Sequence, residues 1–544
     1  MVSHALDLVQ GSFRYGADLP RFLRTTLSRQ EAEAMVQSQL QGRNTGFVRL
    51  LELGVYGNPR SPYRRLLEHA GVSLEDARTL VEQNGVEGAL SRLHDAGIFV
   101  SLEEFKGRAP VRRGSLQFEV SDRDFDNPLL VKHYEGTTGG SRGGGTRVPI
   151  DFDFLAFESA EWLCDLYNAG DADVPQVLWH RGPPGPMGIR TTLILAHLGR
   201  VPPEWFSPTQ TAWNRQGLQG RMMLGFTHLA GRLSGKRLPR PRYVPTAGDL
   251  AVQVAKYVRG GTPATVHCMM SQAVRVCLAA EQAGLNIQGT RFRSGGEPYT
   301  DSKAAVFERL GCSVSPAYSM SEAGSVSLGC GTPFKPDDMH LMRHRLALLQ
   351  RPVQVAPSIK VQGFILTSLS PASPKLMLNV ETGDYGVAEE RDCGCSWHQR
   401  GFTTHVHSVR SYEKLTSEGV TFMGSMLHEL LEETLPRKFG GSITDYQFVE
   451  EEEGGVPFVS LVVSPRVGAL NEEDVKKTIL DQLGFAEWSR LQAETWRQEG
   501  SLKVVRREPY ATMTGKILPL HVMSPPARED AQTDPEEVIP NDED

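Results

Sequence analysis

Apolar residues in the first part of the chain recur at the spacing of helices that bury one face. The segments 28–41 and 73–83 each begin with a serine, and Glu31 and Asp76 stand three residues after those serines. A serine followed at that distance by an acidic residue is the arrangement of a capping box at the start of a helix. We therefore expect residues 1–115 to form a helical layer.

Between residues 116 and 409 the pattern changes to short apolar runs that alternate with segments of helical period. We expect strands at 177–180, 191–198, 264–268 and 364–367, and helices at 249–257 and 272–283. Such alternation is typical of an α/β domain with largely parallel sheets.

A smaller α/β pattern follows over residues 410–525. Its expected elements are helices at 426–435 and 471–483, and strands at 443–450, 457–463 and 502–506. The two strands around EEEGG form a hairpin in this interpretation. Residues 526–544 are rich in acids and poor in apolar residues, which predicts a disordered tail.

Composition narrows the class of protein. A chain of 544 residues is too long for one core, and its net charge of −7 argues against nucleic acid as a partner. No run of eighteen apolar residues is present, so we expect no membrane partner. The first residues lack the pattern of a signal peptide and the chain has seven cysteines, which favours a reducing, cytoplasmic location.

The densest glycine stretch is residues 133–150, HYEGTTGGSRGGGTRVPI. Glycines let a backbone turn tightly around a ligand, and successive N–H groups with threonine hydroxyls favour an anion. The stretch therefore predicts a phosphate-binding loop, although a flexible linker has a similar composition. It is not a Walker loop, because no GK[ST] sequence closes it.

The segment EGTTGGSR resembles the phosphate loop of the adenylate-forming enzymes, the superfamily of acyl-CoA synthetases and adenylation domains. It departs from that loop at Glu135, Ser141 and Arg142, where a small hydroxyl residue, proline and lysine are usual. Further motifs follow in the family's order. They are GGEPYT from 295, YSMSE from 318, ETGDYG from 381 and ATMTGK from 511. GGEPYT resembles the phenylacetate–CoA ligase-like branch in particular.

The resemblance implies a set of ATP-binding residues. They are Thr137, Thr138 and Gly139 on the phosphates, Gly296, Glu297 and Pro298 along the adenine and acyl wall, Tyr318 and Ser321 near the adenine, and Asp384 on the ribose. It also implies catalytic residues. Glu322 would bind Mg²⁺, Lys516 would bridge the substrate carboxylate and the α-phosphate, and Arg410 would mark the hinge.

A Cys-x-Cys pair, Cys393 and Cys395, is more often a metal clip than a disulfide in a reducing compartment. Enzymes of the branch that this chain resembles often have a further Cys and His that complete such a metal site. Cys330 and His340 correspond to these residues, and a Cys₃His set of ligands suits a structural Zn²⁺. His344, His398 and Asp338 compete as the fourth ligand, and unrelated cysteines remain an alternative. The other cysteines are expected in the core. They are Cys164, Cys268, Cys277 and Cys312.

The fold class implied is α/β, with a large N-terminal adenylate-forming domain and a small mobile C-terminal lid. The implied function is ATP-dependent activation of a carboxylic acid, aryl or otherwise compact, to an acyl-AMP with release of pyrophosphate and transfer to CoA. An alternative is an adenylating enzyme that passes the acyl group to a carrier-protein thiol or an amine. The sequence leaves the acid, the acceptor and the oligomeric state open, a homodimer included.

Overall fold

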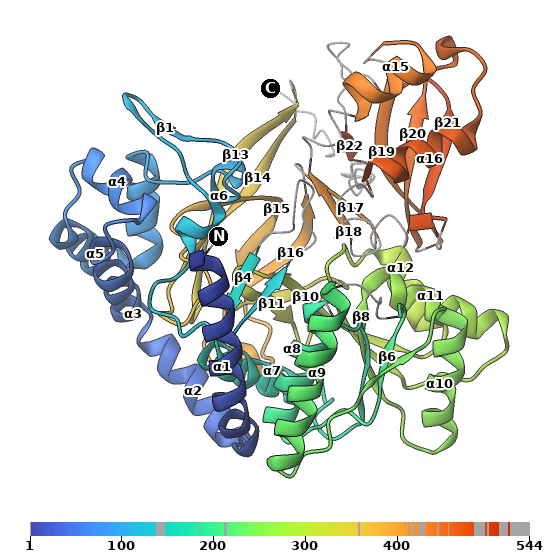
Figure 1. Cartoon of the computed structure of the whole chain (residues 1–544), viewed down its shortest axis with the longest axis horizontal. Coiled ribbons are helices and arrows are strands. Elements are labelled where there is room, and N and C mark those ends of the chain that lie inside the picture. The colour runs from blue at the N-terminus through green and yellow to red at the C-terminus, as the bar shows by residue number, and fades with distance from the viewer. Residues whose placement is uncertain are drawn as a thin grey trace, which may run out of the picture.

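The computed structural model of the chain contains a large domain with a smaller domain at one side (Figure 1). The structure describes residues 2–137, 147–183, 185–210, 215–356, 359–411, 414–417, 420–423, 430–442, 445–454, 456–483, 496–497, 500–510 and 520–522. Within these residues, no helix combines the length and the apolarity that crossing a membrane requires.

The expected N-terminal helical layer is present. Its elements are α1 (Val2–Arg24), α2 (Arg29–Gln41), α3 (Arg43–Leu50), the π-helical turn η1 (Leu51–Tyr56), α4 (Pro62–His69), α5 (Leu74–Asp95) and α6 (Leu102–Phe105). Ser28 and Ser73 cap α2 and α5, and both predicted capping boxes are formed. Helix α5 extends beyond the predicted segment, because Gly85, with φ of 68°, allows a kink rather than an end.

A twelve-stranded sheet forms the centre of the large domain, in the order β13-β14-β15-β16-β12-β11-β10-β9-β8-β5-β6-β7. Its strands are β5 (Gln176–Trp179), β6 (Trp205–Ser207), β7 (Pro241–Tyr243), β8 (Thr265–Met269), β9 (Arg291–Gly295), β10 (Ser313–Met320), β11 (Gly324–Gly329), β12 (Met339–Leu341), β13 (Leu346–Ala356), β14 (Ile359–Ser368), β15 (Val380–Glu390) and β16 (Thr404–Ser411).

The prediction of largely parallel sheets is right for one half of this sheet and wrong for the other. Strands β5 to β10 pair in parallel, whereas pairings from β10 through β13 are antiparallel. The antiparallel half has short connections such as the turn at Ser321–Ala323, and these require no crossover helix. The predicted strands at 177–180, 264–268 and 364–367 correspond to β5, β8 and β14.

The predicted strand at 191–198 is wrong, since these residues belong to helix α8 (Pro186–His197). Its residues from Gly188 to His197 are almost all buried, so the helix lacks the polar face that gives a helical period. The other helices of the domain are η2 (Asp122–Phe125), α7 (Phe152–Asn168), α9 (Arg215–Leu233), α10 (Ala247–Arg259), α11 (Met270–Gln282), α12 (Asp301–Arg309) and α13 (Ser396–Gln399). Helices α10 and α11 confirm the two predicted segments.

Helix α7 links the two halves of the sheet through ion pairs. Its acids on one face are buried, and they are Glu158, Glu161 and Asp165. Each pairs with an arginine from a different part of the domain. The partners are Arg190 on α8, Arg345 before β13 and Arg293 on β9. Buried charges need such partners, because desolvating an unpaired charge is costly.

The smaller domain contains the predicted α/β pattern. Its described elements are β17 (Lys414–Ser417), β18 (Val420–Met423), η3 (Leu430–Thr434), α15 (Leu435–Phe439), β19 (Tyr446–Glu453), β20 (Val456–Val463), η5 (Pro465–Val467), α16 (Glu472–Leu483), β21 (Leu502–Arg506) and β22 (Leu520–Val522). Strands β19 and β20 form the predicted hairpin in a sheet of order β21-β20-β19-β22. Asn471 caps α16, its side-chain oxygen accepting from the N–H of Glu473 at 2.9 Å.

The small domain is held against the large one by Glu452 on β19. Its carboxylate accepts hydrogen bonds from Thr300 Oγ1 at 2.6 Å and Ser302 Oγ at 2.5 Å, and lies 3.2 Å from Lys303 Nζ. These three partners form the beginning of α12, which lies below β19 in Figure 1. One glutamate therefore connects the two domains through two hydroxyls and a buried lysine.

Candidate active site

The predicted phosphate loop is the connection of a β-hairpin. Strands β3 (Tyr134–Thr137) and β4 (Arg147–Ile150) pair antiparallel, with Thr137 opposite Arg147. The base of this hairpin packs on α8, since a Cβ at Gly136 would lie 3.3 Å from Pro186. Thr138 and Gly139 lie outside the described residues, as do Ser141 and Arg142.

The unusual Glu135 has a cationic partner within the hairpin. Arg147 Nη1 donates to Glu135 Oε1 at 2.7 Å, and Nη2 of the same guanidinium donates to Asp126. Burial opposes the charge on Arg147, but the two carboxylates outweigh it and raise the pKa of the guanidinium. Arg147 therefore offsets the charge of Glu135, which would reduce its repulsion of a phosphate at the predicted loop.

A row of alternating charges leads from this hairpin toward Glu322. Lys375 is fully buried, and its Nζ lies 3.1 Å from the second oxygen of Asp126. Burial lowers the pKa of Lys375, while Asp126 and the more distant Glu322 favour its charged form. One ion network thus joins Glu135, Arg147, Asp126 and Lys375. Its last member, Lys375, also interacts electrostatically with Glu322.

Glu322 itself is 4% exposed and lies in the turn between β10 and β11. Its carboxylate pairs with the ammonium group of Lys106, which follows α6 in the N-terminal layer. Burial alone would raise the pKa of Glu322, but Lys106 outweighs burial and holds the pKa below its ordinary value. The predicted Mg²⁺ ligand is therefore an ionised carboxylate that already has a cationic partner.

The structure brings Tyr318 and Asp384 together from strands β10 and β15. The Tyr318 hydroxyl donates to Asp384 Oδ2 at 2.9 Å, and Asp384 is largely buried. Burial and this carboxylate raise the pKa of Tyr318. Asp384 stands opposite Ser411 on β16, and Tyr385 stands opposite Arg410. The predicted ribose-binding aspartate therefore lies beside the predicted hinge.

Arg410 is half-buried at the end of β16. Its Nη1 donates to the carbonyl of Val409 at 2.8 Å and lies 3.9 Å from Asp337. Ser321 is exposed in the turn beside Glu322. Lys516 lies outside the described residues and is therefore not among the groups described at this site.

The GGEPYT stretch follows the end of β9. Gly296 has a φ of 81°, a backbone conformation that other residues rarely adopt, so a substitution there would be strained. Glu297 accepts from the N–H of Ser271 at 3.0 Å and from its hydroxyl at 2.9 Å. The carbonyl of Pro298 accepts from Lys303 Nζ at 2.8 Å. These bonds fix the segment against α11 and α12.

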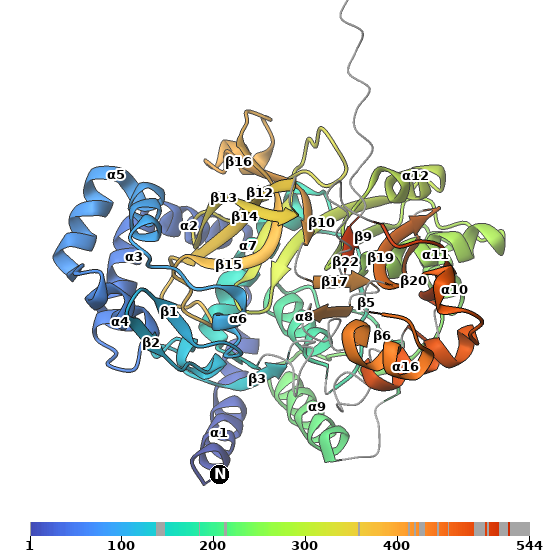
Figure 2. The ribbon, with the colours of Figure 1, turned by 90° about the horizontal axis from the view of Figure 1, so that it is seen from above.

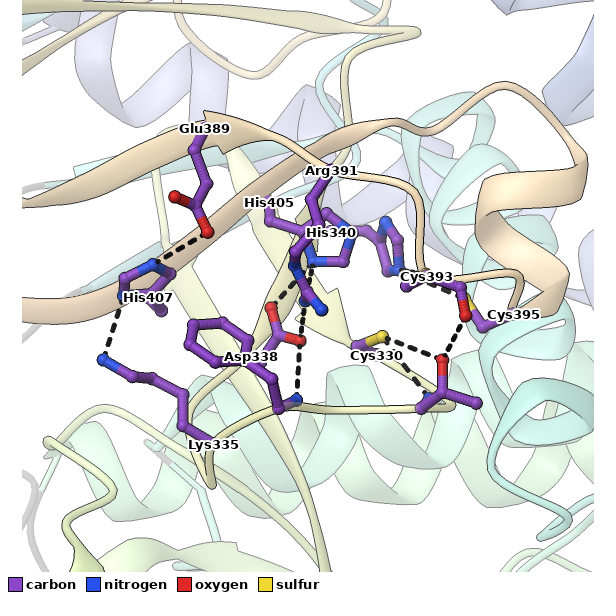
Figure 3. A network of polar contacts seen from close by, with 12 residues as sticks. Cys330, Lys335, Asp338, His340, Glu389, Arg391, Cys393, Cys395, His405 and His407 are labelled. Atoms are coloured by element: carbon purple, nitrogen blue, oxygen red, sulfur yellow. Dashed lines mark hydrogen bonds and ion pairs between the residues drawn. The ribbon is translucent and has the colours of Figure 1, made fainter.

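The four predicted zinc ligands are close neighbours (Figure 3). One ligand atom each from Cys330, His340, Cys393 and Cys395 lies within 4.8 Å of the others. His340 Nε2 is 3.1 Å from Cys395 Sγ and 3.6 Å from Cys393 Sγ. Tetrahedral zinc with ordinary bond lengths places nitrogen and sulfur about 3.5 Å apart. The spacing of these atoms therefore fits such an ion.

The ring of His340 is oriented as a metal ligand requires. Its Nδ1 lies 2.7 Å from the carbonyl of Phe402, which directs Nε2 toward the two thiols. A histidine that ligates a metal usually donates its other nitrogen to a carbonyl or carboxylate in this way. The N–H of Thr332 lies 3.4 Å from Cys330 Sγ, which adds a donor to that sulfur.

The three competing ligands have other partners. Asp338 pairs with Arg391 and with His405 (Figure 3), and His405 Nδ1 lies 2.7 Å from Asp338 Oδ1. His344 Nε2 lies 2.9 Å from Glu161, and His398 Nδ1 lies 3.3 Å from Asp392. The cysteines expected in the core are buried free thiols. They are Cys164, Cys268, Cys277 and Cys312.

Two members of the site carried no sequence signal. Lys106 lies 216 positions before Glu322, and Lys375 lies 249 positions after Asp126. Neither lysine stands in a motif, and only the fold brings them to their carboxylate partners. Arg147, in contrast, belongs to the glycine-rich stretch 133–150 that the sequence analysis identified.

No protein-family model matches the sequence, and no curated protein matches it. Among solved structures, a 2-hydroxyisobutyryl-CoA ligase in complex with 2-HIB-AMP and CoA matches with a TM-score of 0.50 at 17% identity, over 92% of this chain and 91% of that one. ATP-bound MatB from Rhodopseudomonas palustris matches with a TM-score of 0.32 at 13% identity, over 74% and 68%. An acyl-CoA synthetase-like protein from Dyadobacter fermentans matches with a TM-score of 0.27 at 15% identity, over 71% and 87%.

The first of these likenesses extends over almost the whole of both chains. Over the twelve-stranded sheet and the small α/β domain, this chain shares the fold of that 2-hydroxyisobutyryl-CoA ligase. The resemblance drawn from the sequence is thus confirmed at the level of fold, and the phenylacetate–CoA ligase-like branch stays a prediction.

Proposed function

We propose that this protein uses ATP and Mg²⁺ to convert a carboxylic acid into an acyl-AMP, releasing pyrophosphate, and then transfers the acyl group to the thiol of CoA, releasing AMP. The observation that carries the proposal is the charge network between Glu322 and the glycine-rich hairpin. Lys106, Lys375 and the segment with Asp126, Glu135 and Arg147 come from three separate parts of the chain. They converge where the sequence places the phosphates and the metal.

The chemistry explains why these groups are needed. The substrate carboxylate attacks the α-phosphate, and the bond from phosphorus to pyrophosphate breaks. Mg²⁺ held by Glu322 would offset the charge that builds on the phosphates. The buried and ionised state of Glu322 supports that role. Thr137, Thr138 and Gly139 would donate to the phosphates from the hairpin.

The remaining roles place the nucleotide and the mobile domain. Asp384 would accept from the ribose hydroxyls, and Tyr318, joined to it by a hydrogen bond, would pack near the adenine. Residues 410–525 would act as the lid, turning near Arg410, where β16 ends. Lys516 on this lid would contact the reacting carboxylate and α-phosphate during adenylation.

We also propose that Cys330, His340, Cys393 and Cys395 hold a structural Zn²⁺ away from the reaction. Their spacing supports this, as does the bond between His340 Nδ1 and the carbonyl of Phe402. The ion would fix the segment with Cys393 and Cys395, before α13, to strand β12, which carries His340.

The test is product formation from a panel of aryl and other compact acids, followed by mass spectrometry with and without CoA. Lys516→Ala should abolish acyl-AMP formation while ATP binding persists. The control is Lys477→Ala, which removes an exposed lysine on α16 and should leave the protein fully active. Acyl-CoA in the wild type supports the ligase. Acyl-AMP that ignores CoA but loads a carrier protein or an amine would move the acceptor to that class. The absence of acyl-AMP with every acid would contradict the proposal.

A further inference from the structure

Lys106 comes from a segment that is attached to β15. The N–H of Val100 donates to the carbonyl of Asn379 at 3.1 Å, and the N–H of Glu381 donates to the carbonyl of Val100 at 2.9 Å. Helix α6 begins two residues after this bridge, and Lys106 follows its last residue. In Figure 2, α6 lies beside β15 at the inner edge of the N-terminal layer. Lys106 is therefore placed by the strand that also carries Asp384.

The short helix before Lys106 is itself firmly held. Ser101 and Glu104 form a capping box at its start. Both nitrogens at the end of the Arg113 guanidinium donate to the carboxylate of Glu104, at 2.8 Å and 2.9 Å. The N–H of Lys106 donates to the carbonyl of Leu102 at 3.0 Å. The backbone at Lys106 is thus fixed, and a change of partner by the ammonium group requires movement of its flexible side chain alone.

The turn that carries Glu322 is fixed independently of Lys106. The buried guanidinium of Arg345, which pairs with Glu161, donates to the carbonyls of Ala323 and Ser325. These two carbonyls belong to the residues that follow Glu322 in the turn and at the start of β11. The carboxylate of Glu322 would therefore keep its place if the ammonium group moved away.

The carboxylate of Glu322 depends on one close cation. Its side chain is 5% exposed and that of Lys106 is 13% exposed. Within the part of the chain that the structure describes, Lys106 is the one cation at ion-pair distance from this carboxylate. Lys375 favours its ionised form from farther away, but the ammonium group of Lys375 is held 3.1 Å from Asp126. A carboxylate so well buried needs a cation beside it, so Lys106 can be exchanged for another cation more easily than it can be lost.

The inference rests on the proposed function, in which Glu322 binds Mg²⁺ together with the phosphates of ATP. An ammonium group and a divalent ion on the same buried carboxylate would repel each other. We propose that Lys106 holds the place of Mg²⁺ at Glu322 in the free protein and moves to a phosphate group of ATP when the ion binds. An ammonium group suits this exchange, because it is a compact cation on a flexible stem and donates well to phosphate oxygens.

The exchange makes binding of the metal depend on the nucleotide. An ion that arrives alone would displace Lys106 with no phosphate to accept the ammonium group, so the free protein should bind a divalent ion weakly. When ATP is present, its phosphates can ligate the ion and also accept Lys106. Lys106 would thus favour Mg²⁺ that arrives with ATP over Mg²⁺ alone.

The first experiment measures the binding of Mn²⁺, which prefers the same oxygen ligands as Mg²⁺, to the full chain without nucleotide by electron paramagnetic resonance. Lys106→Met should bind Mn²⁺ about tenfold more tightly than the wild type, because no ion pair has to be broken. Lys106→Arg should bind it more weakly, because a guanidinium can hold both carboxylate oxygens. The matched control is Lys503→Met, which removes the lysine that pairs with Glu453 and should leave Mn²⁺ binding unchanged.

The second experiment tests the contact with phosphate through the affinity for ATP without metal. In Glu322→Gln the ammonium group of Lys106 has lost its carboxylate and is available to ATP. This variant should therefore bind ATP about tenfold more tightly than Lys106→Met/Glu322→Gln, which lacks the ammonium group. The double variant should also lose the gain in Mn²⁺ affinity that Lys106→Met shows.

Thermal melting of each variant confirms that it is folded. If Lys106→Met does not fold, Lys106→Arg and the comparison of Glu322→Gln with the double variant still decide. Two results would overturn the proposal. These are Mn²⁺ binding that Lys106→Met does not tighten or Lys106→Arg does not weaken, and equal affinities for ATP in Glu322→Gln and the double variant.

Exchange of pyrophosphate into ATP separates this proposal from the proposed function. Exchange with some acid, together with either overturning result, would reject the role of Lys106 and leave the proposed function standing. The expected changes in Mn²⁺ and ATP affinity, without exchange for any acid, would support the role of Lys106 and reject the activation of a carboxylic acid.

Discussion

At the scale of single residues, the site depends on charges whose partners are far away in the sequence. Glu135 departs from the phosphate-loop pattern, and as an isolated acid it would repel ATP. Arg147, twelve positions later, neutralises it from the facing strand. The sequence shows the unusual acid, but pairing depends on hairpin register, and Lys106 and Lys375 depend on the whole fold. The sequence therefore singles out the motif residues, whereas the charges that set the ionisation of Glu322 and Arg147 follow only from the fold.

The pair between Lys106 and Glu322 gives the first prediction. Lys106→Met leaves a buried carboxylate without its cation, which should lower the free energy of unfolding by about 3 kcal/mol. Because Glu322 would then gain stability by protonation, the loss should be larger at pH 8 than at pH 5. Urea unfolding at both pH values measures this.

Two further variants complete that test. Lys106→Arg keeps the cation and should retain most of the stability, whereas Lys106→Met/Glu322→Gln removes both charges and should recover part of the loss. An equal loss in the single and double variants would show that Lys106 stabilises the fold without the carboxylate of Glu322.

The cysteine and histidine cluster gives the second prediction. Cys393→Ser should remove bound zinc, measured by elemental analysis of the purified protein, and should lower the melting temperature by several degrees. It should leave acyl-AMP formation intact at low temperature, because Cys393 contacts none of the ATP-binding residues described. Cys277→Ala, at a buried free thiol, should keep its zinc. A wild-type protein without metal and with full stability would refute the zinc site.

At the scale of elements, the sequence correctly predicted features that depend on residues close together along the chain. The capping boxes of α2 and α5 and the β19–β20 hairpin were found as expected. Helix α8 was mistaken for a strand because burial on every side removed its period. The antiparallel half of the central sheet was also missed, since strand order follows from packing between distant segments.

The contact between β19 and α12 gives the third prediction. Glu452→Gln keeps the shape of the side chain but removes the charge that holds Lys303 and two hydroxyls. A partly exposed ion pair of this kind contributes about 1 kcal/mol. Amides of residues 296–309 should therefore exchange with deuterium about fivefold faster where exchange requires the domains to separate.

Glu453→Gln is the matched control for this variant. Glu453 is the next residue of β19 and pairs with Lys503 of its own domain at 3.2 Å. The Glu453→Gln variant should leave the deuterium exchange of residues 296–309 unchanged. The same acceleration in both variants would mean that loss of charge on β19, and not the contact of Glu452, loosens the domains.

At the scale of the whole molecule, the position of the small domain should respond to pH. Burial at the domain contact raises the pKa of Glu450 from an ordinary 4.5 to about 8, with Glu297 acting in the same direction as burial and Lys303 and Arg410 against it. The docked state therefore binds a proton more tightly than the undocked state. Docking should be strongest below pH 4.5 and should weaken as the pH rises toward 8.

X-ray scattering in solution measures this fourth prediction. The radius of gyration should increase between pH 6 and pH 9 in the wild type, because the small domain separates from the large one more often. Glu450→Gln, which cannot ionise, should show no such increase. A wild-type radius that does not change over this range would contradict the role of Glu450.

The central claim is that this chain makes an acyl-AMP from a carboxylic acid and ATP. Exchange of labelled pyrophosphate into ATP, measured with a panel of aryl, amino and fatty acids in the presence of Mg²⁺, tests it most directly. Our account predicts exchange with at least one acid, its loss on removal of Mg²⁺, and its loss in Glu322→Gln while that variant remains folded. Exchange with none of the acids, or exchange that Glu322→Gln leaves unchanged, would contradict the account.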